Sequence, residues 1–197
     1  MTTALIVIDM QNDFCPGGKL AVAEGNLIVG EINALMGRHE VTVLTQDWHP
    51  ADHQSFASNH GADPYSLTQM PYGPQVLWPD HCVQGTDGAA FHPELATDPA
   101  DLVLRKGFRP AIDSYSAFFE NDQTTPTGLH GYLRERGVTD LTFCGLALDF
   151  CVAWSALDAV KLGYKVAVKR SACRGIDLDG SLEAALTKMD AAGIRLI

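Results

Sequence analysis

Short apolar runs alternate along this chain with segments of helical periodicity. The apolar runs predict strands over residues 4–9, 41–46, 102–106, 141–145, 165–169 and 194–197. Between them, apolar positions three or four residues apart predict helices over residues 27–38, 128–136, 150–162 and 181–192. Strands that alternate with helices are typical of a parallel sheet covered on both faces. We therefore expect an α/β fold: a three-layer αβα arrangement around a doubly wound, six-stranded parallel sheet.

Residues 48–100 interrupt this alternation. They contain seven of the ten prolines and five of the seven histidines, and they show little periodicity. A loop of this length inside a compact domain is usually functional or disordered, and its aromatic, cysteine and histidine content argues against disorder. We predict one domain over residues 1–197, with a functional loop insertion at about 48–100.

Composition and charge exclude several classes of partner. With 24 acidic and 14 basic residues, the formal net charge of −10 disfavours binding to nucleic acid or to an anionic membrane. The N-terminus has no signal-peptide pattern, and no apolar stretch reaches the roughly 20 residues that span a membrane. Five cysteines without C-x-x-C spacing argue against a disulfide framework. We expect a cytoplasmic protein, monomeric or homo-oligomeric, that acts on a small molecule.

Polar and nucleophilic residues stand at the ends of the predicted strands, where open parallel sheets bind their ligands. Asp9 and Lys106 each close an apolar run, and Cys151 follows a strand at the start of a helix. The unpaired N–H groups and the dipole of that helix favour a thiolate and can hold an oxyanion. A lone buried cysteine is more often an inert core residue. With Asp9 as base and Lys106 as a neighbouring cation, however, Cys151 becomes a candidate nucleophile.

A second group of polar residues has the spacing of a metal site. Asp47 and His49 lie two residues apart, and Pro50 favours the extended conformation that turns both to one side. His81 could complete an Asp-His-His set that leaves positions open, as at zinc, iron or manganese centres. His53 is either a fourth ligand or a residue that orients its neighbours by hydrogen bonds.

Aromatic side chains accompany these polar residues. Phe14, Trp78 and Tyr115 lie in the same predicted loops as the candidate metal ligands and the strand ends. Aromatic residues in such loops either pack into the core or line a pocket for a flat ring. A site for a flat aromatic molecule is therefore one of two interpretations of these residues.

In their order along the chain, these motifs resemble the nicotinamidase/pyrazinamidase branch of the cysteine hydrolases that share the isochorismatase-like fold. The resemblance covers nearly the whole chain. It is carried by residues 8–14 (Ile-Asp-Met-Gln-Asn-Asp-Phe), 45–50 (Thr-Gln-Asp-Trp-His-Pro), 78–85 (Trp-Pro-Asp-His-Cys-Val-Gln-Gly), 105–107 (Arg-Lys-Gly), 113–119 (Asp-Ser-Tyr-Ser-Ala-Phe-Phe) and 145–152 (Gly-Leu-Ala-Leu-Asp-Phe-Cys-Val).

The resemblance implies an activity and a role for each candidate residue. It implies hydrolysis of nicotinamide, and of pyrazinamide, through a thioester on the nucleophile, in the salvage of NAD. The implied catalytic triad is Asp9, Lys106 and Cys151, and the N–H groups of Ala147 and Cys151 would form an oxyanion hole after a cis peptide bond that precedes Ala147. The implied ligands of one divalent metal ion, zinc first, are Asp47, His49 and His81, and the implied substrate pocket includes Phe14, Trp78 and Tyr115.

One residue departs from the family pattern. Leu148 stands where the family usually has threonine, so the hydrogen bonding next to the oxyanion loop should differ. Two alternative functions remain open at this point. The first is a hydrolase of the same fold for another amide, carbamoyl or vinyl-ether compound, although a vinyl-ether hydrolase needs neither the thiol nor the metal. The second is a signalling receiver domain, which shares the strand-end aspartate and lysine but lacks a His/Cys-rich insertion.

Overall fold

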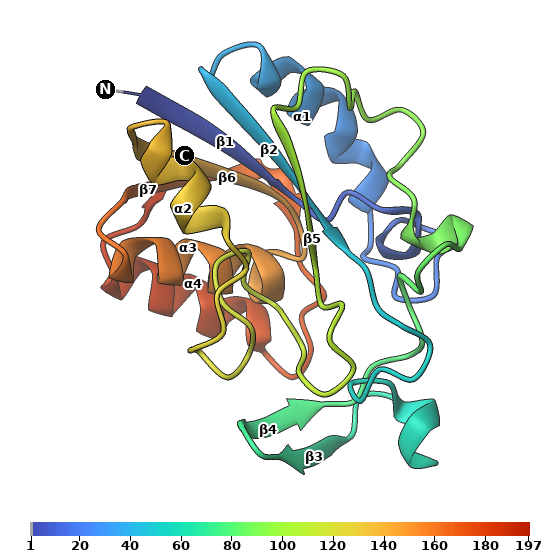
Figure 1. Cartoon of the computed structure of the whole chain (residues 1–197). Coiled ribbons are helices and arrows are strands. Elements are labelled where there is room, and N and C mark those ends of the chain that lie inside the picture. Colours follow the sequence, from blue (N-terminus) through green and yellow to red (C-terminus); the bar gives the residue numbers. More distant parts are fainter. Residues whose placement is uncertain (1) are drawn as a thin grey trace.

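A six-stranded parallel sheet forms the centre of the molecule, which we describe from a computed structural model covering residues 2–197 (Figure 1). The strands run in the spatial order β5-β2-β1-β6-β7-β8, and every adjacent pair is parallel. Their bounds are β1 (Thr2–Ile8), β2 (Val41–Asp47), β5 (Leu102–Lys106), β6 (Val138–Leu146), β7 (Lys165–Arg174) and β8 (Arg195–Leu196). The predicted doubly wound sheet is confirmed.

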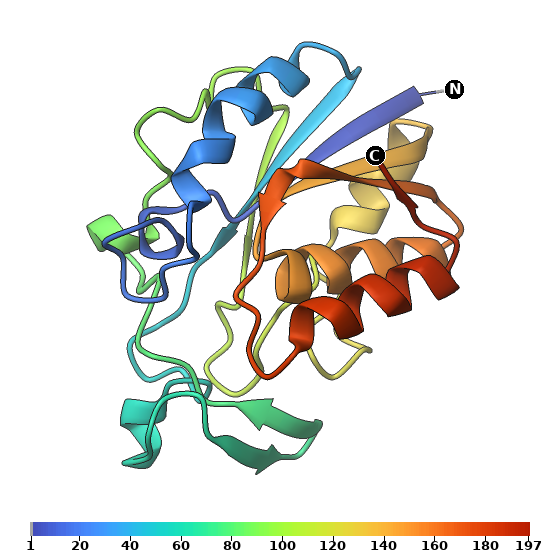
Figure 2. The same ribbon diagram turned by 180° about the vertical axis from the view of Figure 1, so that it is seen from behind.

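Helices cover both faces of the sheet, as predicted. Helix α1 (Val29–Met36) packs on one face, whereas α2 (Leu129–Glu135), α3 (Ala153–Lys161) and α4 (Ser181–Ala191) pack on the other (Figures 1 and 2). The helix predicted over residues 150–162 is α-helical only from Ala153, because a π-helical turn over Leu148–Val152 precedes it. That turn carries Cys151, and π-helical turns are often found at functional sites.

The central strands form the core because both of their faces are buried. Every residue of 4–8 in β1 is at most 1% exposed, and all seven residues of β2 are buried. Burial on both faces explains why β1 is a continuous apolar run over residues 4–8, whereas β2 also buries Thr42, Thr45 and Gln46. The core therefore holds the ends of β1 and β2 in place, and this fixes the positions of the polar residues at those ends.

The loop insertion contains a small hairpin that the sequence did not predict. Strands β3 (Leu67–Met70) and β4 (Gly73–Val76) pair antiparallel and form a two-stranded sheet of their own. The hairpin lies apart from the main sheet, beyond the carboxyl end of β2 (Figure 1). Its strands are short, partly exposed and interrupted by Pro74, which hides the usual period-two signal.

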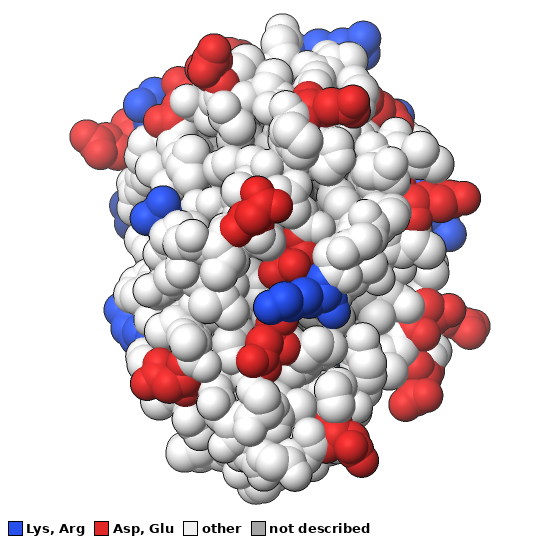
Figure 3. Space-filling model, turned by 90° about the vertical axis from the view of Figure 1, so that its right-hand side faces the viewer, with Lys and Arg blue, Asp and Glu red and all other residues white. Residues whose placement is uncertain are grey.

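The surface matches the acidic composition. On the face shown in Figure 3, acidic and basic side chains are scattered among uncharged ones. Among residues 2–197, no helix is both long enough and apolar enough to cross a membrane.

Candidate active site

The candidate residues meet where the strand order reverses. β1 lies between β2 and β6, so connections leave it in opposite directions and open a crevice at the carboxyl ends of these strands. Asp9 follows β1, Cys151 follows β6, and Asp47 and Lys106 close β2 and β5. One carboxylate oxygen of each aspartate and the Cys151 sulfur all lie within 4.8 Å of one another. The structure thus brings together four residues that the sequence placed at separate strand ends.

Lys106 is the centre of this cluster. Its side chain is fully buried, and its Nζ lies 2.9 Å from Asp9 Oδ2 and 2.5 Å from Asp47 Oδ1. The same nitrogen donates to the Ser114 carbonyl at 2.8 Å and lies 3.6 Å from Cys151 Sγ. Although burial opposes the charge, the two carboxylates raise the pKa of Lys106 well above its usual value. The ammonium therefore joins the candidate triad to the candidate metal site.

Asp9 has the properties of a proton acceptor near neutral pH. Burial, followed by the nearby Asp47 carboxylate, raises the pKa of Asp9 to about 6, although the Lys106 ammonium opposes the rise. The Thr45 hydroxyl fixes the carboxylate by donating to Asp9 Oδ1 at 2.6 Å, and it accepts from the Asp9 backbone N–H at 3.1 Å. The backbone here is left-handed, with φ of 47°.

Opposing effects act on the pKa of Cys151. The helix start and Lys106 predicted a thiolate, but burial raises the pKa of Cys151 well above its usual value and outweighs the lowering effect of Lys106. Burial therefore favours the neutral thiol at this position. A neutral thiol needs a base before it can attack, and Asp9 is the adjacent group that can take its proton.

The loop before the nucleophile adopts an unusual backbone. The peptide bond between Leu146 and Ala147 is cis, as the family resemblance implies. Gly145 has φ of 114°, and a Cβ at this residue would lie 2.1 Å from the backbone oxygen of Ile8, so only glycine fits beside β1. Leu148 is buried in the hydrophobic core, where an apolar side chain is suitable. The role of the Ala147 and Cys151 N–H groups stays a prediction.

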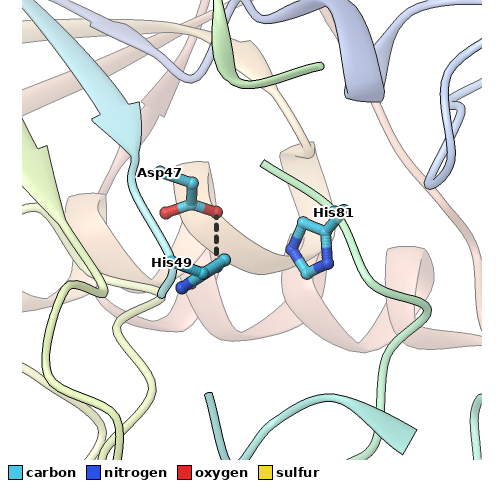
Figure 4. Close-up of side chains that lie close together, drawn as sticks. All are labelled: Asp47, His49 and His81. Carbon is cyan, nitrogen blue, oxygen red and sulfur yellow. Dashed lines mark ion pairs between the residues drawn. The ribbon is translucent and has the colours of Figure 1, made fainter. Parts of the chain in front are cut away.

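Asp47, His49 and His81 converge as the sequence predicted. Their side chains lie close together: Asp47 ends β2, His49 follows it by two residues, and His81 lies in the loop after β4 (Figure 4). One donor atom from each lies within 4.8 Å of the others, and all three residues are buried. Buried carboxylate and imidazole donors at this separation suit a divalent transition metal.

The outer nitrogens of both imidazoles are already held. His49 Nδ1 lies 2.8 Å from the Gly107 carbonyl, and His81 Nδ1 lies 2.7 Å from the Pro79 carbonyl, so each Nδ1–H donates and Nε2 is the ring nitrogen left for a metal. Burial and the neighbouring His49 lower the pKa of His81 to about 4, which keeps its ring neutral. The donor set therefore fits a metal ion.

His53 lies beside this group but has other contacts. Its donor atoms cluster with those of His49 and Asp113 rather than with the set of Asp47, His49 and His81. Its Nδ1 lies 2.7 Å from the Ser55 hydroxyl, and its Nε2 lies 3.3 Å from the Ile112 carbonyl. These contacts agree better with an orienting role than with metal ligation. A role as fourth ligand stays a prediction.

Gly107 is a residue whose importance the sequence did not show. Its φ is 65°, and a Cβ there would lie 2.4 Å from Cε1 of the His49 ring. We expect Gly107→Ala to displace His49 and to weaken metal affinity by roughly 10–100-fold, the range typical of disturbed ligand support. Competition with a chromophoric chelator measures this. Gly163→Ala is the matched control, because Gly163 also has positive φ but has no atom near its missing Cβ. Equal affinities in the two variants would contradict the role of Gly107.

Aromatic side chains form a cavity next to Cys151. Phe14, Trp78 and Tyr115 all line it, as predicted, together with Leu20, Phe150, Ile176 and the polar Asp47, His81 and Asp113. Trp78 packs edge-on against Phe150 at 5.0 Å and Tyr115 at 6.2 Å between ring centroids. Such walls suit a flat aromatic ring, with the thiol and the metal group at its edge.

Several supporting residues were missed because their signal lies in tertiary contacts. Gln11 is fully buried, and its amide donates to the Asp47 carbonyl and accepts from the Asp47 N–H, each at 2.8 Å. Gln75, from the unpredicted hairpin, donates to the Asp113 carboxylate at 2.8 Å and to the Tyr115 hydroxyl at 3.0 Å. Only the position of Gln11 within the first motif could have indicated its role.

Known proteins share this fold. A family model described as the isochorismatase domain matches residues 3–197. A nicotinamidase of Acinetobacter baylyi is 54% identical over 98% of this chain and 91% of its own length. The solved structure of an Acinetobacter baumannii nicotinamidase and pyrazinamidase superposes with a TM-score of 0.98 at 56% identity, over 100% of this chain and 95% of that one. A zinc complex of Pyrococcus horikoshii pyrazinamidase gives a TM-score of 0.80 at 36% identity, over 100% and 99% of the two chains.

Proposed function

Because the chain belongs to the isochorismatase family, we propose that it hydrolyses nicotinamide to nicotinate and ammonia, and pyrazinamide in the same way. The observation that carries this proposal is the meeting of Asp9, Lys106 and Cys151 at the edge of an aromatic cavity. The nicotinamidases reported above share half or more of their residues with this chain. The proposal includes a role in NAD salvage in the cytoplasm.

The reaction proceeds through a covalent intermediate on Cys151. Asp9 takes the thiol proton, and the sulfur attacks the carboxamide carbon to form a tetrahedral oxyanion, which the N–H groups of Ala147 and Cys151 hold. The C–N bond breaks, and ammonia leaves with the proton from Asp9. A water molecule then attacks the thioester, again with Asp9 as base, and releases nicotinate and the free thiol.

Lys106 supports both partners of the proton transfer. Its ammonium lies 2.9 Å from Asp9 Oδ2 and 3.6 Å from Cys151 Sγ, so it stabilises the carboxylate before the transfer and the thiolate during it. Burial of all three groups strengthens these interactions, because little water screens them. The raised pKa of Asp9, about 6, brings the base close to the operating range of an enzyme at neutral pH.

Asp47, His49 and His81 would hold one divalent metal ion, for which we propose zinc, with iron or manganese as alternatives. When bound, the metal supplies a Lewis-acidic anchor for the pyridine nitrogen, directly or through bound water. Asp47 also contacts Lys106, so the carboxylate of one candidate metal ligand is paired with a residue of the triad. The aromatic side chains orient the ring so that its carboxamide faces Cys151.

Removal of the metal should lower kcat/KM for nicotinamide. We expect chelated, metal-free protein to show at least a roughly tenfold lower kcat/KM for nicotinamide, because the ring loses its anchor while the triad remains. Activity should return when zinc is added back. Metal analysis and ammonia-release kinetics on the same sample check this. Equal kcat/KM with and without metal would show that the assigned role is wrong.

An ammonia-release assay tests the proposed function itself. The protein should hydrolyse nicotinamide and pyrazinamide, and it should act poorly on benzamide, which has the carboxamide but lacks the ring nitrogen. Isochorismate tests the rival vinyl-ether hydrolysis, and carbamoylated amines test carbamoyl hydrolysis. Turnover of either rival class with no ammonia from nicotinamide would reject the proposal.

A further inference from the structure

Two hollows of very different size share a lining residue next to the nucleophile. The cavity next to Cys151 is narrow, with a volume of about 20 Å³ between its aromatic walls. A groove between α3 and α4 has a volume of about 640 Å³, within the range of ligand pockets. These two helices lie side by side on one face of the sheet (Figure 2). Within residues 2–197, Phe150 is the one residue that lines both hollows.

The other aromatic walls of the small cavity are held in place from behind. Phe14 and Trp78 are each 3% exposed, and the Trp78 indole N–H donates to the Tyr115 hydroxyl at 3.0 Å. Phe150 is only partly buried, and its ring stands edge-on to Trp78 and Tyr115 at centroid distances of 5.0 and 5.7 Å. Among the aromatic rings of this cavity, it is the one with groove space behind it.

The position of Phe150 in the chain ties this wall to the chemistry. It immediately precedes Cys151, and its backbone N–H donates to the Ala147 carbonyl at 3.2 Å. The residue therefore keeps a fixed place next to the sulfur while it also lines the groove. Trp154, one turn further on, lines the groove without lining the cavity, and it packs on Tyr115 at 5.6 Å.

We propose that Phe150 is the specificity-determining wall that limits the site to single-ring aromatic amides. Loss of its ring would join the cavity to the groove, so that a substrate extended by a second ring could bind with its carboxamide still at Cys151. Filling or opening apolar space of this kind changes the ratio of kcat/KM between two substrates by about one to two orders of magnitude. This inference rests on the proposed amide hydrolysis.

The test compares two substrates that share the reacting group. Nicotinamide and quinoline-3-carboxamide carry the same pyridine ring and carboxamide, and the second adds a fused benzene ring. The measured quantity is the ratio of kcat/KM for quinoline-3-carboxamide to that for nicotinamide, which does not depend on the fraction of active protein. Phe150→Ala should raise this ratio by ~10-fold or more, and Phe150→Leu by a smaller factor. Trp154→Ala is the matched control and should leave the ratio unchanged.

The outcomes separate this inference from the proposed function. A ratio in the Phe150→Ala and Phe150→Leu variants that stays within about twofold of wild type rejects the role of Phe150. An equal rise in Trp154→Ala also rejects it, because the groove alone would then set the limit. If only Phe150→Leu folds, its ratio decides. If wild-type protein releases no ammonia from nicotinamide, the proposed function fails and this inference fails with it.

Discussion

Cys151→Ala is expected to lower kcat for ammonia release from nicotinamide by at least ~10⁴-fold, because no other group can form the acyl intermediate. Cys151 is the one cysteine that lines the aromatic cavity, among the residues that the structure describes. Its side chain is small, and truncation to alanine should leave the fold intact. Initial rates of ammonia release, together with circular dichroism of the same preparation, check both statements.

Cys144→Ala is the matched control for this experiment. Cys144 is also a fully buried free thiol, seven residues earlier on β6, but it does not line the cavity. Its removal should cost some stability and leave kcat close to the wild-type value. Nucleophilic catalysis by Cys151 would be refuted if Cys151→Ala kept more than about a hundredth of wild-type turnover.

Lys106→Met is expected to destabilise the protein by about 3–5 kcal/mol, the usual result of removing one partner from a buried ion cluster. The substitution keeps much of the side-chain volume but leaves the carboxylates of Asp9 and Asp47 without their shared cation. Ammonia release should fall as well, because Asp9 and the Cys151 thiolate lose their stabilising charge. Urea denaturation of the metal-loaded protein measures the change in the free energy of unfolding.

The control is Lys169→Met. Lys169 is partly exposed and pairs with the exposed Glu31 at 3.6 Å, so its removal should cost less than about 1 kcal/mol. A similar, small loss in both variants would mean that Lys106 is not held in a desolvated cluster. Unchanged ammonia release by Lys106→Met would contradict its proposed support of the proton transfer.

The central sheet could be predicted because burial on both faces leaves a strong local signal. β1 is apolar over residues 4–8 and changes abruptly to a charged residue at Asp9, whereas β2 is buried but carries polar residues before it ends at Asp47. The hairpin β3–β4 gave no such signal, because exposed short strands with a proline resemble a loop. Local pattern therefore predicted the scaffold but not the hairpin that supports the pocket wall.

The site was predicted in part for a similar reason. Strand-end position identified Asp9, Lys106 and Cys151, but the protonation state of Cys151 depends on how deeply the folded chain buries it. Burial cannot be read from residue order. Gln11 and Gln75 were missed because the role of an amide side chain depends on the groups it hydrogen-bonds, and these come from distant segments of the chain. Phe150 likewise gains importance only once the cavity and the groove are seen to share it.

The thioester on Cys151 is the central claim, and acid quenching in the first turnover tests it most directly. Wild-type protein is mixed with nicotinamide, quenched with acid before the steady state, digested and examined by mass spectrometry. We predict one nicotinoyl group on the peptide that contains Cys151, appearing before nicotinate and absent from Cys151→Ala. Nicotinate formation with Cys151 unmodified at every time point would contradict the mechanism.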